Sequence, residues 1–234
     1  MRNQYYVVVE ELLKKVEKTQ AKNITKAAGM IADSIISGGL LQAFGCGHSM
    51  AGAIEITSRA GGLVPAKWIK EPALGVYERI EGVGELFCQK LDVKKEDTVV
   101  LISNSGRNPL PIEVAIKCKS AEAKIIVVTS MEASKKLRSK HSAGKNLWEY
   151  ADVILDNCVT DGDAAIEVPN LPIKVCGTSS VAVAVMLNAM ILEAIELMLS
   201  KGFIPPVLMS SNLDGGPEFN EKLNQKYFDR LYHI

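Results

Sequence analysis

Residues 97–121, DTVVLISNSGRNPLPIEVAIKCKSA, contain one complete structural unit of the chain. The run from Val99 to Ile102 is apolar at consecutive positions, which indicates a strand covered on both faces, as in a parallel sheet. The turn NSGRNP follows, and then apolar residues at 112, 115 and 116 repeat with helical spacing. This stretch therefore predicts a strand, a tight polar turn and a helix, which is the repeating unit of α/β folds.

The same unit recurs along the chain. Strands are predicted at 40–44, before a helix over 49–60, at 124–130, before a short polar helix in MEASKKLRS, and at 151–156. A long apolar helix is expected from Ser179 to Ser200, and a tail that is first a loop and then helical, with its break at 215–217. The predicted fold class is α/β, a three-layer doubly wound parallel sheet.

The N-terminal segment predicts helices that pack beside this core. Apolar residues repeat at three and four positions from Tyr5 to Ile36, with an interruption near Lys22 and Asn23, so two helices are expected before Gly38. No linker separates a second domain. We therefore expect a single domain over 1–234, with a helical arm at 1–38, an α/β core at 39–203 and a C-terminal loop and helix at 204–234.

Charge and composition exclude several classes of protein. The chain has 27 Lys and Arg against 27 Asp and Glu, and this zero net charge argues against nucleic-acid partners and polybasic membrane binding. No run of 18 uncharged apolar residues occurs, the longest being Val181 to Leu192, so no membrane partner is expected. The N-terminal run YYVVV is unlike a signal peptide. Five cysteines without a CxxC pair indicate buried thiols, and we expect a cytoplasmic protein.

Turns that follow parallel strands meet at one edge of the sheet, where such folds bind ligands. The first turn, GCGHS at 45–49, has two glycines before a helix N-terminus, which suits an anion, although a turn that needs glycine dihedrals explains it equally well. A nucleotide site would place a third glycine where Met50 stands. The third turn, CGTSSV at 176–181, is also compatible with simple helix capping.

The second turn, SNSGRN at 103–108, is more informative. Two hydroxyls spaced two apart, amides and a glycine precede a helix, which exceeds what one helix cap requires. Neutral donors of this kind can hold a phosphate without a lysine or a metal. The predicted ligand-binding residues are Ser103, Asn104, Ser105, Gly106, Arg107 and Asn108, with Gly47 and Ser49 from the first turn and Ser179 from the third.

With these motifs the chain resembles the sugar isomerase (SIS) domain, and within it the single-domain, phosphoheptose-isomerase-like branch. The resemblance runs from Leu40 to about Asn212 and rests on G-x-G-x-S, on I-S-x-S-G and on the Ser-rich turn before the long helix. Further segments similar to family signatures are RAGGLVP (59–65), ERIEG (78–82), HSAGKNL (141–147) and DGDA (161–164).

The resemblance implies a five-stranded parallel sheet of flavodoxin-like topology and a phosphorylated sugar as ligand. It also implies a homodimer or homotetramer built through helices, with sites near the subunit interfaces. Ser103, Ser105 and Asn108 fall where the family's phosphate-binding Ser, Ser and Thr stand. Ser49 falls at a sugar-contacting position, and Ser179 at the last turn that reaches the substrate.

Isomerisation of a sugar needs a base and a proton donor. Glu55 follows Ser49 by six residues and faces the ligand side of its predicted helix, Glu78 lies in ERIEG, and His48 lies within the first turn. Each carboxylate could instead be an ordinary surface or interface charge. His141 is a less anchored candidate. Arg59 stands near the family's base, and no histidine lies between Ser179 and Ser200, so the heptose reaction itself is not implied.

The sequence therefore predicts a phosphosugar-binding protein that is a sugar-phosphate isomerase of the aldose–ketose type. The expected mechanism is metal-independent acid/base proton transfer through an enediolate, with catalytic Glu55, Glu78 and His48 and with no cofactor. Two alternatives remain open: a non-catalytic phosphosugar sensor, and a lyase or etherase acting on an amino-sugar phosphate. A nucleotide-dependent oxidoreductase fits the motifs less well.

Overall fold

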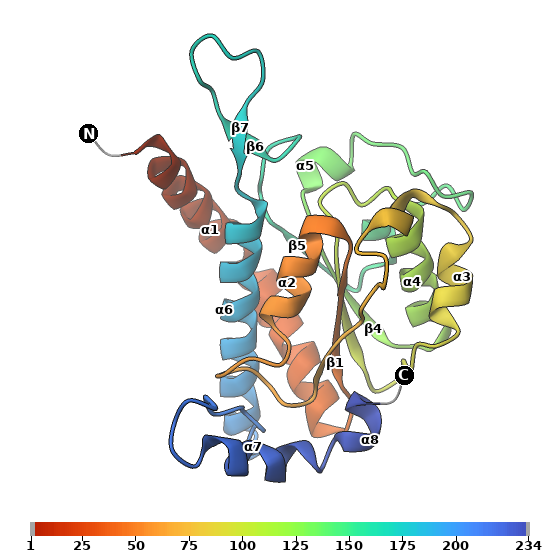
Figure 1. Cartoon of the computed structure of the whole chain (residues 1–234), viewed down its shortest axis with the longest axis vertical. Helices are drawn as coiled ribbons and strands as arrows, with labels where there is room; N and C mark the ends of the chain where they lie inside the picture. Colours follow the sequence, from red (N-terminus) through yellow and green to blue (C-terminus); the bar gives the residue numbers. More distant parts are fainter. Residues whose placement is uncertain (1–2, 233–234) are drawn as a thin grey trace.

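The computed structural model describes residues 3–232. Five parallel strands form one sheet in the order β2-β1-β3-β4-β5, with β1 at Leu41–Gly45, β2 at Ala66–Trp68, β3 at Thr98–Ile102, β4 at Lys124–Thr129 and β5 at Val153–Asp156. Helices cover both faces (Figure 1). The strand order is the flavodoxin-like one, so the predicted fold class is confirmed. The edge strand β2 had no sequence signal of its own.

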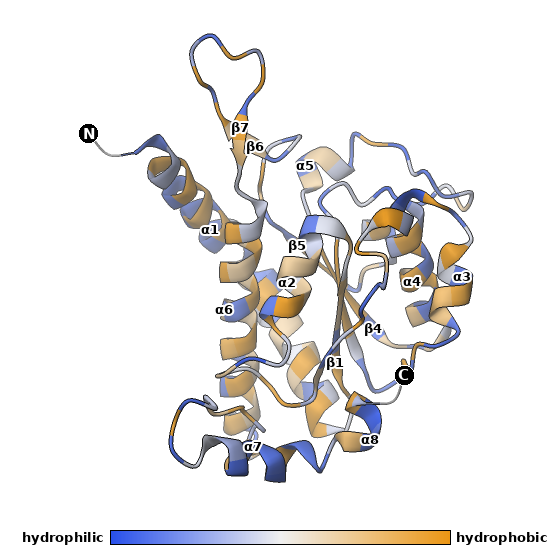
Figure 2. Ribbon diagram, in the orientation of Figure 1, coloured by the Kyte–Doolittle hydropathy of each residue, from blue (hydrophilic) through white to orange (hydrophobic). Residues whose placement is uncertain are grey.

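The central strand β3 divides the protein into two cores. Val100 and Ile102 pack on one face with the helices α1 and α6, whereas Val99 and Leu101 pack on the other face with α4. All four side chains are buried, at 3% exposure or less. Successive side chains of a strand point to opposite faces, so an uninterrupted apolar run is what a sheet between two helical layers needs. The ribbon coloured by hydropathy shows α6 predominantly apolar along its length and α7 predominantly hydrophilic (Figure 2).

The N-terminal helix corrects one prediction. Instead of two helices, α1 runs without a break over Gln4–Ile36. Its buried stripe passes through Val16, Gln20 and Ile24, and Gln20 hid the pattern because it is polar yet faces the core. Gln20 Oε1 accepts the backbone N–H of Asp156 at 3.1 Å, at the end of β5. The buried amide thus satisfies a strand end while the stripe continues.

The remaining helices and the hairpin connect and flank the sheet. Two helices are shorter than predicted. The helix expected over 49–60 ends at Glu55, and the helix expected in MEASKKLRS ends at Ser134. The helical elements are η1 (Gly47–Ser49), α2 (Met50–Glu55), η2 (Val76–Arg79), α3 (Val83–Cys88), α4 (Pro109–Ser120), α5 (Met131–Ser134), η3 (Leu147–Tyr150), α6 (Ser179–Ser200), α7 (Gly216–Asn224) and α8 (Phe228–Leu231). An antiparallel hairpin of β6 (Ala164–Ile166) and β7 (Val175–Gly177) projects from the body (Figure 1).

The long helix α6 is confirmed at its predicted bounds. Among the described residues it is the one helix that is long and apolar enough to cross a membrane, and 44% of its most apolar stretch is buried within the protein. Core helices of water-soluble proteins share this composition. Its buried side chains, among them Ala182, Met186 and Met190, belong to the core beneath the sheet together with α1.

A buried ion pair fastens the C-terminal helix to the start of the sheet. The Asp97 carboxylate is fully buried and accepts two hydrogen bonds from the Arg230 guanidinium, at 2.9 and 2.8 Å. It also accepts the backbone N–H groups of Leu40 and Lys94. Burial opposes ionisation, but the hydrogen bonds from Arg230 and from the backbone outweigh it and lower the pKa of Asp97.

We therefore predict that Arg230→Ala destabilises the protein by about 3 kcal/mol, because Asp97 keeps its burial and loses its counter-ion. Since the folded-state pKa of Asp97 lies below the unfolded value of about 3.9, its contribution is complete at neutral pH and is lost as the pH falls through the folded pKa. Urea unfolding at several pH values measures both effects. The exposed pair Lys95–Glu122 supplies the control, and a Lys95→Ala loss as large as that of Arg230→Ala would contradict the prediction.

Candidate functional site

A cavity of about 370 Å³ opens at the carboxyl ends of β1 and β3. In the strand order β2-β1-β3-β4-β5 the chain passes from β1 to β2 on one side, and then crosses to β3 on the other side of β1. The strand order therefore reverses between β1 and β3. Doubly wound sheets bind ligands at such a switch point. The residues that line the cavity are Cys46, Gly47, His48, Ser49, Gly52, Glu78, Ile102, Ser103, Asn104, Ser105, Asp163, Ser179, Ser180 and Val183.

Eight of the predicted site residues line this one cavity: Gly47, His48, Ser49, Glu78, Ser103, Asn104, Ser105 and Ser179. Gly106, Arg107 and Asn108 continue the second turn without lining it. Asp163 and Ser180 are lining residues that the site prediction missed. Asp163 lies in the DGDA segment, which the sequence marked without assigning it a role.

Close contact between two glycines brings Glu78 into the cavity. A Cβ atom added to Gly75 would lie 2.7 Å from the backbone nitrogen of Gly47, so the loop before η2 rests directly on the first turn. Gly75 has a φ of 95°, which favours glycine. The buried carboxylate of Glu71 accepts the N–H groups of Ala73 and Gly75 and fixes this loop. Three residues further on, Glu78 faces the cavity.

The second turn divides its polar groups between structure and site. Ser103 Oγ accepts the N–H of Gly106 at 3.2 Å, and Asn104 Oδ1 accepts from Asn157. Asn108 Nδ2 donates to Glu78 Oε1 at 2.8 Å, which joins this turn to η2. Within residues 3–232, no hydrogen bond engages the half-buried Ser105, so its hydroxyl is one donor of this turn that is open to a ligand.

The third turn is occupied by a side chain of the protein itself. One Asp163 oxygen accepts the N–H groups of Thr178 and Ser179 at 3.0 and 2.8 Å, and the other accepts Ser179 Oγ–H at 2.7 Å. A carboxylate at a helix N-terminus is favourable because the helix dipole is positive there. Asp163 therefore takes the place at α6 where an external anion could bind, and Ser179 can offer a ligand only an acceptor oxygen.

The chemistry of the cavity is that of hydroxyls, amides, carboxylates and one imidazole. Among the described residues that line it, none is Lys or Arg. Burial, and then the negative charges of Glu78 and Glu71, raise the pKa of the Cys46 thiol, so Cys46 stays protonated and is a poor nucleophile. Glu78 is half-buried and His48 is exposed at the cavity mouth. An anion here would rest on neutral donors, and proton transfer would fall to Glu78 and His48.

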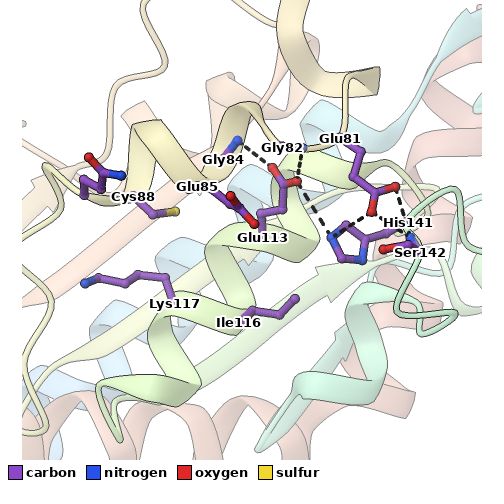
Figure 3. A pocket seen from close by; sticks show the side chains of 11 residues that line it. Glu81, Gly82, Gly84, Glu85, Cys88, Glu113, Ile116, Lys117, His141 and Ser142 are labelled. Carbon is purple, nitrogen blue, oxygen red and sulfur yellow. Dashed lines mark hydrogen bonds and ion pairs between the residues drawn. The ribbon is translucent and has the colours of Figure 1, made fainter.

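Glu55 and His141 lie outside this cavity. Glu55, the last residue of α2, forms an ion pair with Arg59 and accepts from Asn188 Nδ2 on α6 at 2.7 Å. Its catalytic role stays a prediction. His141 lies between Glu81 and Glu113 in a neighbouring cavity of about 530 Å³ (Figure 3).

The fold and the site define a doubly wound α/β protein with hydroxyl-rich turns gathered at its switch point. A family model described as the SIS domain matches residues 4–130. A UPF0309 protein of Listeria monocytogenes is 52% identical over 230 residues, which cover 98% of each of the two chains. The chain belongs to the SIS domain family.

Two solved structures share this fold. A phosphoheptose isomerase from Neisseria gonorrhoeae has a TM-score of 0.59 and 17% identity, covering 82% of this chain and 95% of its own. A phosphoheptose isomerase from Francisella tularensis has a TM-score of 0.60 and 16% identity, covering 83% and 96%. At these identities the likeness concerns the fold alone, whereas the family model confirms the resemblance to the SIS domain.

The open hydroxyl of Ser105 generates a binding prediction. A sugar phosphate that binds the native state raises the melting temperature, and Ser105→Asp abolishes this shift by placing a negative charge where the phosphate would lie. Differential scanning fluorimetry with a panel of sugar phosphates measures it. Asn170→Asp adds the same charge at the exposed tip of the hairpin and keeps the shift. An undiminished shift in Ser105→Asp would remove the second turn from the site.

Proposed function

We propose that this protein binds a phosphorylated sugar and interconverts its aldose and ketose forms. Membership of the SIS domain family supports a phosphosugar ligand. The observation that carries the reaction is the position of Glu78: a half-buried carboxylate within the cavity, held by Asn108 of the very turn that offers Ser105. A base and a phosphate-binding turn thus share one small space.

The proposed binding mode uses neutral donors. The phosphate is held by the Ser105 hydroxyl and by the backbone of the second turn ahead of α4, with Ser49 across the cavity. Ser103 supports this turn through Gly106. Ser179 and Ser180 border the side where the sugar hydroxyls lie. The phosphate anchors the substrate, which makes the later proton transfer an intramolecular event.

The proposed reaction moves one proton between neighbouring carbons. Glu78 takes the proton from C2 of the open-chain aldose, the electrons form the enediolate, and the protonated Glu78 returns the proton to C1. His48 at the cavity mouth transfers the hydroxyl proton between O2 and O1, since imidazole suits proton transfer near neutrality. Substrate and product have the same composition, so the reaction needs no net oxidant or reductant.

One observation favours the sensor alternative. Glu55, the carboxylate expected on the first helix of the core, is paired with Arg59 and Asn188 outside the cavity. Within one chain the cavity then offers two carboxylates, and Asp163 is already engaged by α6. A protein of this design could bind a phosphosugar without converting it. A lyase or etherase would use the same base but would release part of the substrate.

The test is exchange for deuterium of the C2 proton of aldose phosphates and of a C1 proton of ketose phosphates, followed by NMR in D₂O with a panel of both. We expect exchange by the native protein and a loss of about 100-fold or more in Glu78→Gln, whose melting temperature shift with the same ligand persists. Glu85→Gln, an exposed carboxylate of α3 outside the cavity, is the matched control and keeps the exchange. Binding without exchange across the panel would establish the sensor, and release of a fragment would establish the lyase or etherase.

We further propose that the protein is a homodimer or homotetramer whose sites lie near the subunit interface. Val185, Leu192 and Leu199 are exposed apolar residues of α6 at intervals of seven. Asn188 continues the same stripe at a spacing of three and four, and holds Glu55 beside it. A heptad stripe of this kind suits packing against the same helix of a second copy, and such packing would place Glu55 at the interface.

Light scattering coupled to size exclusion checks this proposal. Leu192→Glu places a charge in the centre of the stripe, so we expect the native assembly to fall to the mass of one chain. Leu86→Glu, on the exposed face of α3, leaves the assembly intact. A native protein that elutes as a single chain, or an assembly that survives Leu192→Glu, would contradict the proposal.

The domain and compartment predictions complete this proposal. We propose that residues 1–234 form one SIS domain, in agreement with the relative that matches across 98% of the chain. We also propose a cytoplasmic location. Its support is the state of the cysteines: all five are free, and Cys46, Cys88, Cys118 and Cys158 are buried, as in proteins of a reducing compartment.

A further inference from the structure

A buried carboxylate outside this cavity holds the segment that follows Glu78. Glu113 on α4 is 7% exposed, and its two oxygens accept the backbone N–H groups of Gly82 and Gly84 at 2.5 and 2.6 Å (Figure 3). A Cβ atom on Gly84 would lie 2.1 Å from Glu113 Oε2, so this approach requires glycine. Each oxygen of this buried carboxylate thus accepts a backbone N–H of one loop.

This contact is one of two that join residues 78–84 to α4. Asn108 at the N-cap of α4 donates to Glu78. Glu113, five residues later, holds Gly82, which follows Glu78 by four residues and turns the chain with a φ of 91°. The length of chain between the two contacts is short, so the backbone position at Gly82 determines where Glu78 can lie.

His141 supplies a third contact from another loop. Its Nδ1 accepts the N–H of Ala143 at 3.0 Å, which places the imidazole proton on Nε2. Nε2 lies 3.7 Å from an oxygen of Glu81 and 3.7 Å from an oxygen of Glu113. The N–H of Ser142 donates to both Glu81 oxygens at 3.1 Å. The imidazole N–H therefore points between two carboxylates of the segment and of α4 (Figure 3).

From this geometry we infer that Glu113, assisted by His141, is a positioning residue for Glu78. It does not line the cavity itself, and it acts by fixing the backbone at Gly82 and Gly84. This inference rests on the proposed function, in which Glu78 is the base. A carboxylate is required at position 113 because two N–H donors converge there, whereas a glutamine offers one oxygen to accept and an NH₂ group that repels the second donor.

A double-mutant cycle between positions 113 and 78 tests the inference in the full-length protein. We expect Glu113→Gln to lower kcat for the exchange reaction by about tenfold or more, as for a displaced catalytic group, with KM within about twofold because the phosphate turn is untouched. In the Glu78→Gln background the same change has no further effect, since its only route is Glu78. Glu85→Gln, an exposed carboxylate of the same neighbouring cavity, changes neither constant.

Multiplicative losses in the double variant, or a rise in KM matching the fall in kcat, would assign Glu113 a merely structural role and overturn the inference. An unchanged kcat in Glu113→Gln would overturn it as well.

The NMR signal of the Asn108 side-chain amide gives a readout that needs no turnover, and so separates this inference from the proposed function. We expect Glu113→Gln to move this signal, because Asn108 Nδ2 donates to the displaced Glu78, and Glu85→Gln to leave it in place. A protein without isomerase activity that shows this shift would refute the proposed reaction and keep the positioning role. An unmoved Asn108 signal in Glu113→Gln would overturn the inference.

Discussion

The structure depends on the double burial of β3. Its side chains alternate between a core formed with α1 and α6 and a core formed with α4, so every other element is placed by which side of this strand it covers. Parallel pairing with β1 and β4 then sends all the strand ends to the same edge. The connections after β1 and β3 leave toward opposite sides of the sheet, and the cavity opens between these two strand ends. The site is thus a consequence of how the central apolar run is covered.

Close contacts at glycine residues then determine where the loops around the cavity lie. Gly75 rests on Gly47, Gly84 rests on Glu113, and Gly52 admits Val183 and Ile102 to within 2.8 Å of where its Cβ would be. Buried carboxylates accompany two of these contacts, since Glu71 and Glu113 each accept two backbone N–H groups. A buried acid satisfied by amides needs no cation partner. Glu71, Glu113 and Asp163 are therefore engaged by backbone N–H groups, whereas Glu78 lines the cavity with no such bond among residues 3–232.

The sequence predicted the elements whose burial is complete and missed those whose position depends on long-range contacts. The runs at β1, β3 and β4 and the helix α6 are apolar enough to be recognised locally. The short strand β2 pairs at the edge through three residues and carries no such pattern. Gln20 made α1 look interrupted because its partner, Asp156, is remote in sequence. The turns were recognisable because strand ends converge, but the placing of Glu78 inside the cavity and of Glu55 outside it depends on loop packing that no local spacing encodes.

The distribution of the cysteines has a practical consequence for chemical work on this protein. The pKa values of the Cys46, Cys88, Cys118 and Cys158 thiols are all raised, chiefly by burial, which leaves them slow toward electrophiles. Cys176 alone among the five is exposed. It lies on β7, two residues before Thr178. The native chain thus carries a single accessible attachment point for a fluorophore or spin label, at the start of the third turn, where a reporter can follow occupancy of the cavity without engineered cysteines.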